Sequence, residues 1–165
     1  MIEFEPLRKD DLPLVRVWLE REHVRRWWGA ESLDHAEDAL SGRDKSEYFV
    51  IALDGRPVGM IQTYLVSDYP EWEQVVGPGE GLAGVDLLIG EEDVLGRGLG
   101  PQVLERFAQE VVFARATTKA VVATVEGANR RSWRAFEKAG FRHVADVVEE
   151  GLPHRLLRLD RRYAQ

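Results

Sequence analysis

The middle of the sequence carries the pattern that most restricts the fold. An apolar run, LAGVDLLIG, starts at residue 82 and is followed by three glycines at alternate positions, 96, 98 and 100. An amphipathic helix pattern then runs to about residue 115, and a second apolar run, KAVVATV, occupies 119–125. Two buried strands joined through a helix form a parallel pair, because a helical crossover returns the chain to the same end of the sheet. The sequence therefore predicts a β-α-β unit with a glycine-rich turn at the mouth of its helix.

The glycine-rich turn itself predicts an anion site. Gly96, Gly98 and Gly100 allow backbone angles that are closed to other residues and let N–H groups approach a ligand closely. They open a helix, whose unpaired N–H groups and dipole favour negative charge at this end. The segment GRGLG lacks the Lys-Ser/Thr of a P-loop, and its spacing differs from the GxGxxG of dinucleotide folds. We expect a phosphate or diphosphate here; a mobile turn before the helix is the alternative that these letters leave open.

Strands and helices are predicted on both sides of this unit. Asp54-Gly55 separates two β-branched runs and is a strong hairpin signal. Residues 67–81 contain two prolines and three glycines without a sustained period, and are predicted as a long functional loop. The remaining predicted elements are a strand at 2–7, helices at 11–21, 31–42 and 129–139, and two final strands at 141–150 and 154–162 joined through Gly151 and Pro153.

These elements predict a fold of the α/β (α+β) class. Strands and helices mix along the chain, so we expect a mixed central sheet of about six to seven strands with helices on both faces. The length of 165 residues and the lack of a repeat or linker predict one domain over residues 1–165.

Composition narrows the setting and the partners. The chain has no cysteine, which indicates a reducing environment, and no apolar run long enough to cross a membrane, so a cytoplasmic protein is expected. The net charge of −7 argues against a nucleic-acid partner. No histidine spacing predicts a metal site. A monomer or a homodimer is expected.

Charge is unevenly distributed along the chain. No Lys, Arg or His occurs between Arg56 and Arg97, whereas eight carboxylates fall in that stretch. Such a run builds a negative field that attracts cations. A polycationic small ligand is one interpretation, and a solvated acidic loop is the other.

Two motifs resemble the GNAT family of acetyl-CoA-dependent N-acetyltransferases. LGRGLG opens a helix and matches the family loop at Gly98 and Gly100, although Leu95 stands where the family has Gln or Arg. Asn129, followed by the helix ending EKAGF, matches the second family motif. EHVRRWWG, PVGMIQTYLV, EWEQ and GVDLLIG further resemble aminoglycoside 6'-N-acetyltransferases, and siderophore-lysine acyltransferases look similar in the WW region.

The resemblance implies a cofactor and a catalytic residue. Acetyl-CoA is the implied cofactor, and main-chain N–H groups near Leu88 or Ile89 would meet the thioester oxygen. Asp86 is the implied general base, and we expect its apolar neighbours to raise its pKa; a solvent-facing strand-edge carboxylate is the alternative. The full set of cofactor-binding residues expected on this basis is Leu88, Ile89, Arg97, Gly98, Leu99, Gly100, Asn129 and Phe136.

Phe136 departs from the family pattern. Many relatives place a Tyr here to protonate the departing thiolate, and a phenyl ring carries no such proton. Water, or another tyrosine such as Tyr64 or Tyr69, would then supply it.

Aromatic and acidic side chains are predicted to bind the acceptor. Rings can form walls against sugars, and carboxylates can bind ammonium groups. The tryptophans could equally pack in the core. The predicted substrate-binding residues are Trp28, Tyr64, Asp68, Glu71, Trp72, Glu73 and Asp86.

The sequence leaves three functions open. The first is acetylation of the 6'-amino group of an aminoglycoside. The second keeps the fold and cofactor but takes another amine, a siderophore hydroxylysine or a protein N-terminus. The third is a non-catalytic sensor that binds acetyl-CoA, an option that Phe136 keeps open.

Overall fold

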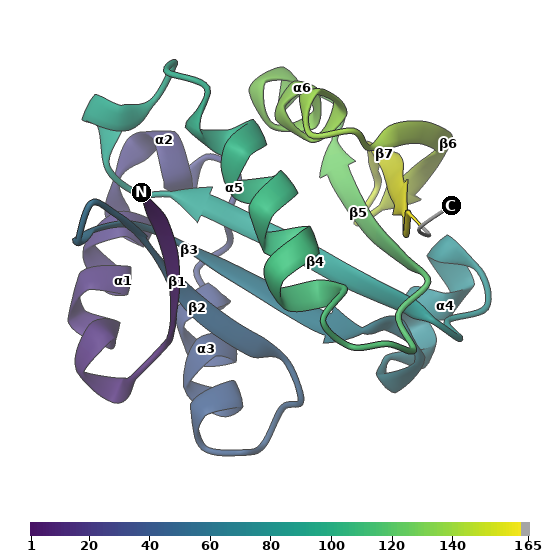
Figure 1. Cartoon of the computed structure of the whole chain (residues 1–165), viewed down its shortest axis with the longest axis horizontal. Coiled ribbons are helices and arrows are strands. Elements are labelled where there is room, and N and C mark those ends of the chain that lie inside the picture. Colours follow the sequence, from purple (N-terminus) through teal and green to yellow (C-terminus); the bar gives the residue numbers. More distant parts are fainter. Residues whose placement is uncertain (163–165) are drawn as a thin grey trace. The chain divides into compact units, whose positions relative to one another are not determined.

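The computed structural model describes residues 1–162, in which strands and helices are mixed along the chain (Figure 1). The elements in chain order are β1 (Ile2–Pro6), α1 (Leu12–Glu20), α2 (Glu22–Arg25), α3 (Ser32–Leu40), β2 (Glu47–Leu53), β3 (Arg56–Leu65), α4 (Pro70–Val76), β4 (Leu82–Ile89), α5 (Leu99–Phe107), β5 (Ala120–Glu126), α6 (Arg130–Lys138), β6 (Arg142–Glu149) and β7 (Leu152–Asp160).

The strands form a seven-stranded mixed sheet in the order β1-β2-β3-β4-β5-β7-β6. The predicted parallel pair is present, because Leu82–Gly84 of β4 run parallel to Ala120–Val122 of β5. The β1–β2, β2–β3, β5–β7 and β6–β7 pairs are antiparallel. The prediction of a mixed sheet of six to seven strands with helices is therefore confirmed.

Two compact units are distinguished within the described chain. The first comprises Met1–Thr63 and Asp86–Leu99, and the second comprises Tyr64–Val85 and the chain from Gly100 onward. Strands β3 and β4 contribute residues to both units. The prediction of a single domain over residues 1–165 stays a prediction.

The first unit has a core between helices α1 and α3 and one face of β2 and β3. Trp18 and Val15 on α1 are fully buried there, together with Val50 and Met60 from the hairpin. The hairpin turn is as predicted, because Asp54 and Gly55 have φ values of 51° and 81°, which are typical of a type I′ turn.

One core cluster of the second unit is covered by α4. Val66, Leu82, Ala120, Val122 and Leu156 are buried in it, and Tyr64, Trp72, Val76 and Val147 pack against them. Helix α6 packs against β5, β6 and β7. Its Phe136 is buried and meets Phe141 edge to face, with ring centroids 5.0 Å apart.

The prediction of a loop over residues 67–81 was wrong. A 3₁₀ turn spans Val66–Asp68, and helix α4 occupies Pro70–Val76. Pro70 suits the first helical turn because it lacks an N–H that would otherwise be unpaired, and the acids Glu71 and Glu73 favour the same end of the helix. Seven residues are too few to show the periodicity by which longer helices are predicted.

Two further boundaries differ from the prediction. Strands β6 and β7 are joined through Glu150 and Gly151, both at positive φ, whereas Pro153 lies inside β7. The helix expected to reach about residue 115 is α-helical only to Phe107 and continues as a π-helical turn over Ala108–Val112. Within residues 1–162, no helix is long and apolar enough to cross a membrane.

Candidate active site

Asp86 lies on β4 and is half-buried between two buried strand residues, Val85 and Leu88. Gln62 on β3 donates a hydrogen bond from its Nε2 to Asp86 Oδ2 at 3.0 Å. Both the strand and the amide restrict the carboxylate, so its orientation is fixed by the fold. A half-buried carboxylate whose position is fixed in this way is a chemically suitable proton acceptor.

The glycine loop has the geometry required to bind an anion. Gly96 and Gly98 have φ values of 73° and 75°, which residues with a side chain rarely adopt, and the space beside each Cα is open. Leu99 is buried and begins α5, so the helix mouth is anchored while the loop before it is exposed. A Cβ on Gly100 would come within 3.3 Å of the Ala135 methyl group, so Gly100 lets α5 pack closely on α6. The main chain of this loop is therefore open to the approach of a ligand.

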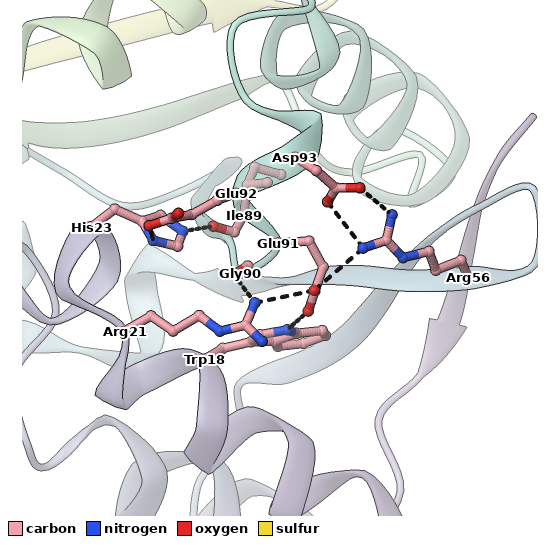
Figure 2. A network of polar contacts seen from close by, with 9 residues as sticks. All are labelled: Trp18, Arg21, His23, Arg56, Ile89, Gly90, Glu91, Glu92 and Asp93. Carbon is pink, nitrogen blue, oxygen red and sulfur yellow. Dashed lines mark hydrogen bonds and ion pairs between the residues drawn. The ribbon is translucent and has the colours of Figure 1, made fainter.

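The end of β4 is held by side chains from α1 (Figure 2). The Trp18 ring lies flat against Gly90, where a Cβ would come within 2.1 Å of ring carbons. The indole Nε1 donates to Glu91 Oε2 at 2.6 Å. Arg21, which follows α1, donates to the Gly90 carbonyl at 2.8 Å. Only glycine fits at position 90, and the aromatic ring fixes its main chain.

Charged groups extend this network toward the glycine loop. Glu91 Oε1 lies 3.1 Å from Arg21 and 3.3 Å from Arg56, and Arg56 binds both oxygens of Asp93, at 2.8 and 2.9 Å. The Trp18 N–H, with help from the two guanidinium groups, lowers the pKa of Glu91. The hydrogen bonds from Arg56 lower the pKa of Asp93. Both carboxylates are therefore ionised at neutral pH.

His23 on α2 contacts the last residue of β4. Its Nε2 lies 2.9 Å from the Ile89 carbonyl oxygen, and Figure 2 shows the ring beside Ile89 and Glu92. One residue earlier, Gly59 packs so closely on β4 that a Cβ would lie 2.2 Å from the Leu88 carbonyl. The main chain at 88–90 is therefore fixed from β3 and from the α1–α2 region.

Two predicted aromatic residues lie in the second unit. The Tyr64 ring covers Gly84, where a Cβ would come within 2.2 Å of the ring, and it meets Tyr69 edge to face at 5.3 Å. Trp72 on α4 is half-buried and, with Tyr64, packs on the core cluster that α4 covers. In the first unit, Trp28 is half-buried against the core beneath α1 and α3. Each ring combines a packed face with an exposed part.

The predicted acidic residues of α4 and its preceding turn differ in their engagement. Glu73 Oε2 accepts a hydrogen bond from the Gly79 N–H at 2.8 Å and thereby closes the chain after α4. Glu71 is exposed, and Asp68 is half-buried in the 3₁₀ turn. Glu71 is therefore the most accessible of the three carboxylates.

Helix α6 begins after Asn129 and carries a surplus of positive charge. The Asn129 side chain makes no cap hydrogen bond to the helix. The sequence RRSWRAFEK has four cations and one acid, and Arg130, Arg131 and Lys138 form no ion pair within residues 1–162. Arg97, in the glycine loop, is exposed. These groups favour an anionic ligand.

Several residues of this arrangement were not predicted from the sequence. Gln62 could have been found as a polar residue inside an apolar strand that faces the predicted strand of Asp86. His23, Arg21 and Glu91 carried no such signal, because their partners lie 66 or more residues away in the chain. His23 in particular was given no role.

The mixed sheet, the parallel β4–β5 pair and the glycine loop that opens α5 together describe the fold around the candidate site. The chain belongs to the GNAT acetyltransferase family, since the model of the acetyltransferase (GNAT) domain matches residues 8–148. The predicted family is therefore confirmed.

Individual proteins that are similar to this chain have more specific names than the family. The chain is similar to aminoglycoside N(6')-acetyltransferase type 1 of Klebsiella pneumoniae, with 28% identity over 152 residues that cover 86% of this chain and 74% of the relative. A crystal structure of aminoglycoside acetyltransferase AAC(6')-Ib with coenzyme A has the same fold, with a TM-score of 0.85, 24% identity, and 98% and 95% of the two chains covered. Another, with coenzyme A and kanamycin, gives a TM-score of 0.84 at 25% identity, with the same coverage.

Proposed function

We propose that this protein is an acetyl-CoA-dependent N-acetyltransferase that acetylates the 6'-amino group of aminoglycoside antibiotics, with Asp86 as general base. The observation that carries the proposal is the half-buried Asp86 carboxylate, held by Gln62 at 3.0 Å on the strand that precedes the glycine loop. The similarity to aminoglycoside N(6')-acetyltransferase type 1 supports the choice of acceptor. Antibiotic resistance would follow from the reaction.

The acceptor must lose a proton before it can attack. Amines of amino sugars are largely protonated at neutral pH, and the nitrogen lone pair is free only in the neutral form. Asp86 would bind the ammonium group and remove one proton, while the Gln62 amide keeps the carboxylate in place. General bases of this kind contribute typically 10²- to 10⁴-fold to the rate.

Main-chain donors would hold the cofactor and polarise its carbonyl group. Acetyl-CoA, when bound, supplies the acetyl group as an electrophilic thioester. N–H groups of Gly98, Leu99 and Gly100 at the mouth of α5 would bind its diphosphate, as the dipole and the open glycine geometry favour. Main-chain N–H groups near Leu88 or Ile89 would donate to the developing oxyanion, which is commonly a large contribution in acyl transfer.

Further cofactor contacts are proposed from the β5–α6 region and the loop. Asn129 would donate its side-chain amide, and the cations of α6 and Arg97 would attract the phosphates. Phe136, buried against Phe141, offers an apolar surface and no proton. The departing thiolate therefore takes its proton from water or from a tyrosine; Tyr64 and Tyr69, paired edge to face, are the candidates.

The acceptor side would be built from carboxylates and rings. Glu71, Asp68 and Glu73 place negative charge in and before α4, which suits a polycation. Tyr64, Trp72 and Trp28 each keep an exposed part that can pack on a sugar ring. A relative of the same fold was crystallised with kanamycin, which supports a sugar with several amines as acceptor. A cytoplasmic location follows from the need for acetyl-CoA.

One assay tests the proposal against its alternatives. Thiol release from acetyl-CoA is followed with kanamycin or tobramycin, with hydroxylysine, and with a short peptide as acceptor. We expect thiol release with the aminoglycosides. Release with only hydroxylysine or the peptide would contradict the proposed acceptor. If no acceptor gives thiol while acetyl-CoA raises the melting temperature, the sensor function would replace it, as the missing proton donor at Phe136 would allow.

A further inference from the structure

The chain at the end of β4 and directly after it is held at every position from Leu88 to Glu91. Gly59 allows β3 to press on the Leu88 carbonyl, His23 meets the Ile89 carbonyl, and Arg21 meets the Gly90 carbonyl. Trp18 and two arginines then hold the Glu91 carboxylate. Because all these residues belong to the first unit, the end of β4 is fixed from within that unit.

His23 makes the contact that bears most directly on this main chain. A carbonyl oxygen only accepts hydrogen bonds, so the Nε2 that lies 2.9 Å from Ile89 O carries the proton. Nδ1 is buried without a hydrogen-bond partner, and its nearest carboxylate oxygen, Glu92 Oε1, lies 3.3 Å away. The His23 side chain is only 19% exposed. The mostly buried ring therefore makes two contacts: a hydrogen bond donated to the Ile89 carbonyl and an Nδ1 contact at ion-pair distance from Glu92.

The position of the Ile89 peptide matters because of what lies on either side of it. Leu88 and Ile89 provide the main-chain N–H groups that the proposed function uses at the thioester, and the chain reaches Gly96 and Gly98 of the diphosphate loop within nine residues. A shift at Ile89 would change the distance between these two parts of the cofactor site. Misplacement of about 1 Å can reduce an enzymatic rate by about 10²-fold.

We propose that His23 is a positioning residue, which fixes the Ile89 carbonyl through Nε2–H and so aligns the end of β4 with the acyl group. This inference rests on the proposed function. It predicts that a side chain with a donor at the Nε2 position preserves turnover and that an apolar side chain of similar size does not.

Three variants test the inference. His23→Leu removes both ring nitrogens and keeps a similar volume. His23→Gln retains an N–H donor at the end of the side chain. Both variants lose the Nδ1–Glu92 contact, so that contact does not distinguish them. The matched control is His35→Leu, since His35 is exposed on α3. For each variant, kcat and the KM values for acetyl-CoA and kanamycin are measured together with the melting temperature.

We expect His23→Leu to lower kcat roughly 10- to 100-fold with a KM for kanamycin within about 2-fold of the wild type. His23→Gln should stay within about 3-fold of the wild-type kcat, and His35→Leu should match the wild type. Unchanged kcat in His23→Leu would overturn the inference. So would equal losses in His23→Leu and His23→Gln that follow their melting temperatures, because a structural role alone explains that result.

A binding and spectroscopic readout separates this inference from the proposed function. The amide ¹H–¹⁵N shifts of Ile89 and Gly90 are recorded for the wild type and both His23 variants, and the Kd for coenzyme A is measured by calorimetry. Shifts that move in His23→Leu and return in His23→Gln support the positioning role even if no acceptor gives thiol in the wild type. Shifts that stay unchanged in His23→Leu contradict it, whatever the activity.

Discussion

Helices α4 and α6 of the second unit are of similar length but opposite in charge. Helix α4, PEWEQVV, carries two glutamates and no cation, whereas α6, RRSWRAFEK, carries four cations and one glutamate. Helix α6 buries Phe136, and α4 has no fully buried residue. These two helices therefore carry opposite net charges, although the whole protein has a net charge of −7.

The difference matches the two reactants of the proposed function. Acetyl-CoA is a polyanion and an aminoglycoside is a polycation, so each would be drawn to the helix of opposite charge. A single negative surface would attract the acceptor and repel the cofactor. In the proposed function, α6 would attract acetyl-CoA and α4 would attract the aminoglycoside. Neither helix would carry out the chemical step.

The largest effect is expected from a variant of β4, the strand on which the chemical step is proposed to occur. Asp86→Asn keeps the shape of the side chain and removes its ability to take a proton. We expect kcat to fall about 10²-fold or more, within the range for general bases, while the Kd for coenzyme A changes little. Steady-state kinetics with kanamycin and calorimetry measure the two quantities. A wild-type rate in this variant would exclude Asp86 as the base.

The second prediction compares how firmly the two helices are anchored. Gly140 and Gly77 follow α6 and α4 with φ values of 102° and 96°, and a Cβ would meet no atom closer than 3.5 Å at either position. Alanine at positive φ values of this size costs about 1–3 kcal/mol, and Gly77, with ψ of −176°, lies in a region that is essentially reserved for glycine. We expect Gly140→Ala to lower the free energy of global unfolding by about this amount, since α6 is anchored by buried Phe136.

Gly77→Ala should instead leave global unfolding nearly unchanged, because α4 buries no residue completely and can open locally. Urea denaturation measures the free energy of global unfolding, and amide hydrogen exchange measures the free energy of local opening of α4. Equal losses of global stability in the two variants would show that α4 is as firmly anchored as α6.

The third prediction concerns the cations of α6. Arg131 lies one helical turn before Ala135, the residue that packs on Gly100 at the start of α5. Arg131→Gln should raise the Kd for coenzyme A about 2- to 5-fold at low salt, with a smaller change at high salt. Arg16→Gln, at an exposed position of α1, is the matched control. If both variants change the Kd equally, the effect belongs to net charge and not to α6.

The smallest expected effect concerns α4. Glu71 is exposed, so its attraction for an ammonium group is largely screened by water and salt. Glu71→Gln should raise the KM for kanamycin about 2-fold and leave the KM for acetyl-CoA and kcat unchanged. Glu37→Gln on α3 serves as the control. A larger change for acetyl-CoA than for kanamycin would reverse the comparison between the helices.

The success of prediction from sequence also differs between the two helices. Helix α6 has a nine-residue amphipathic pattern and a glycine at positive φ after its end, and both signals are local. Helix α4 was missed, because its seven residues start at Pro70 and end just before Gly77, in a segment whose composition favours loops. Local signals predict an element only when the element is long enough to repeat them.

The residues of the candidate site likewise differ in whether the sequence predicts them. Asp86 and the loop glycines could be selected from the sequence because a lone carboxylate in an apolar strand and glycines before a helix are visible in a few letters. Gln62 was not selected, because its place beside Asp86 depends on the register of two strands. His23, Arg21 and Trp18 act on main chain and side chains 66 to 73 residues away.

The sequence by itself determined the chain order of the strands and of the longer helices, the hairpin at Asp54-Gly55, the parallel unit around the glycine loop and the family. These features follow from periodicity and turn chemistry, which act over a few residues. Only the tertiary structure decided why Gly84 and Gly90 must be glycine, since each lies beneath an aromatic ring from a distant element. It also decided which side chains hold the end of β4, because close packing between distant segments leaves no local trace in the sequence.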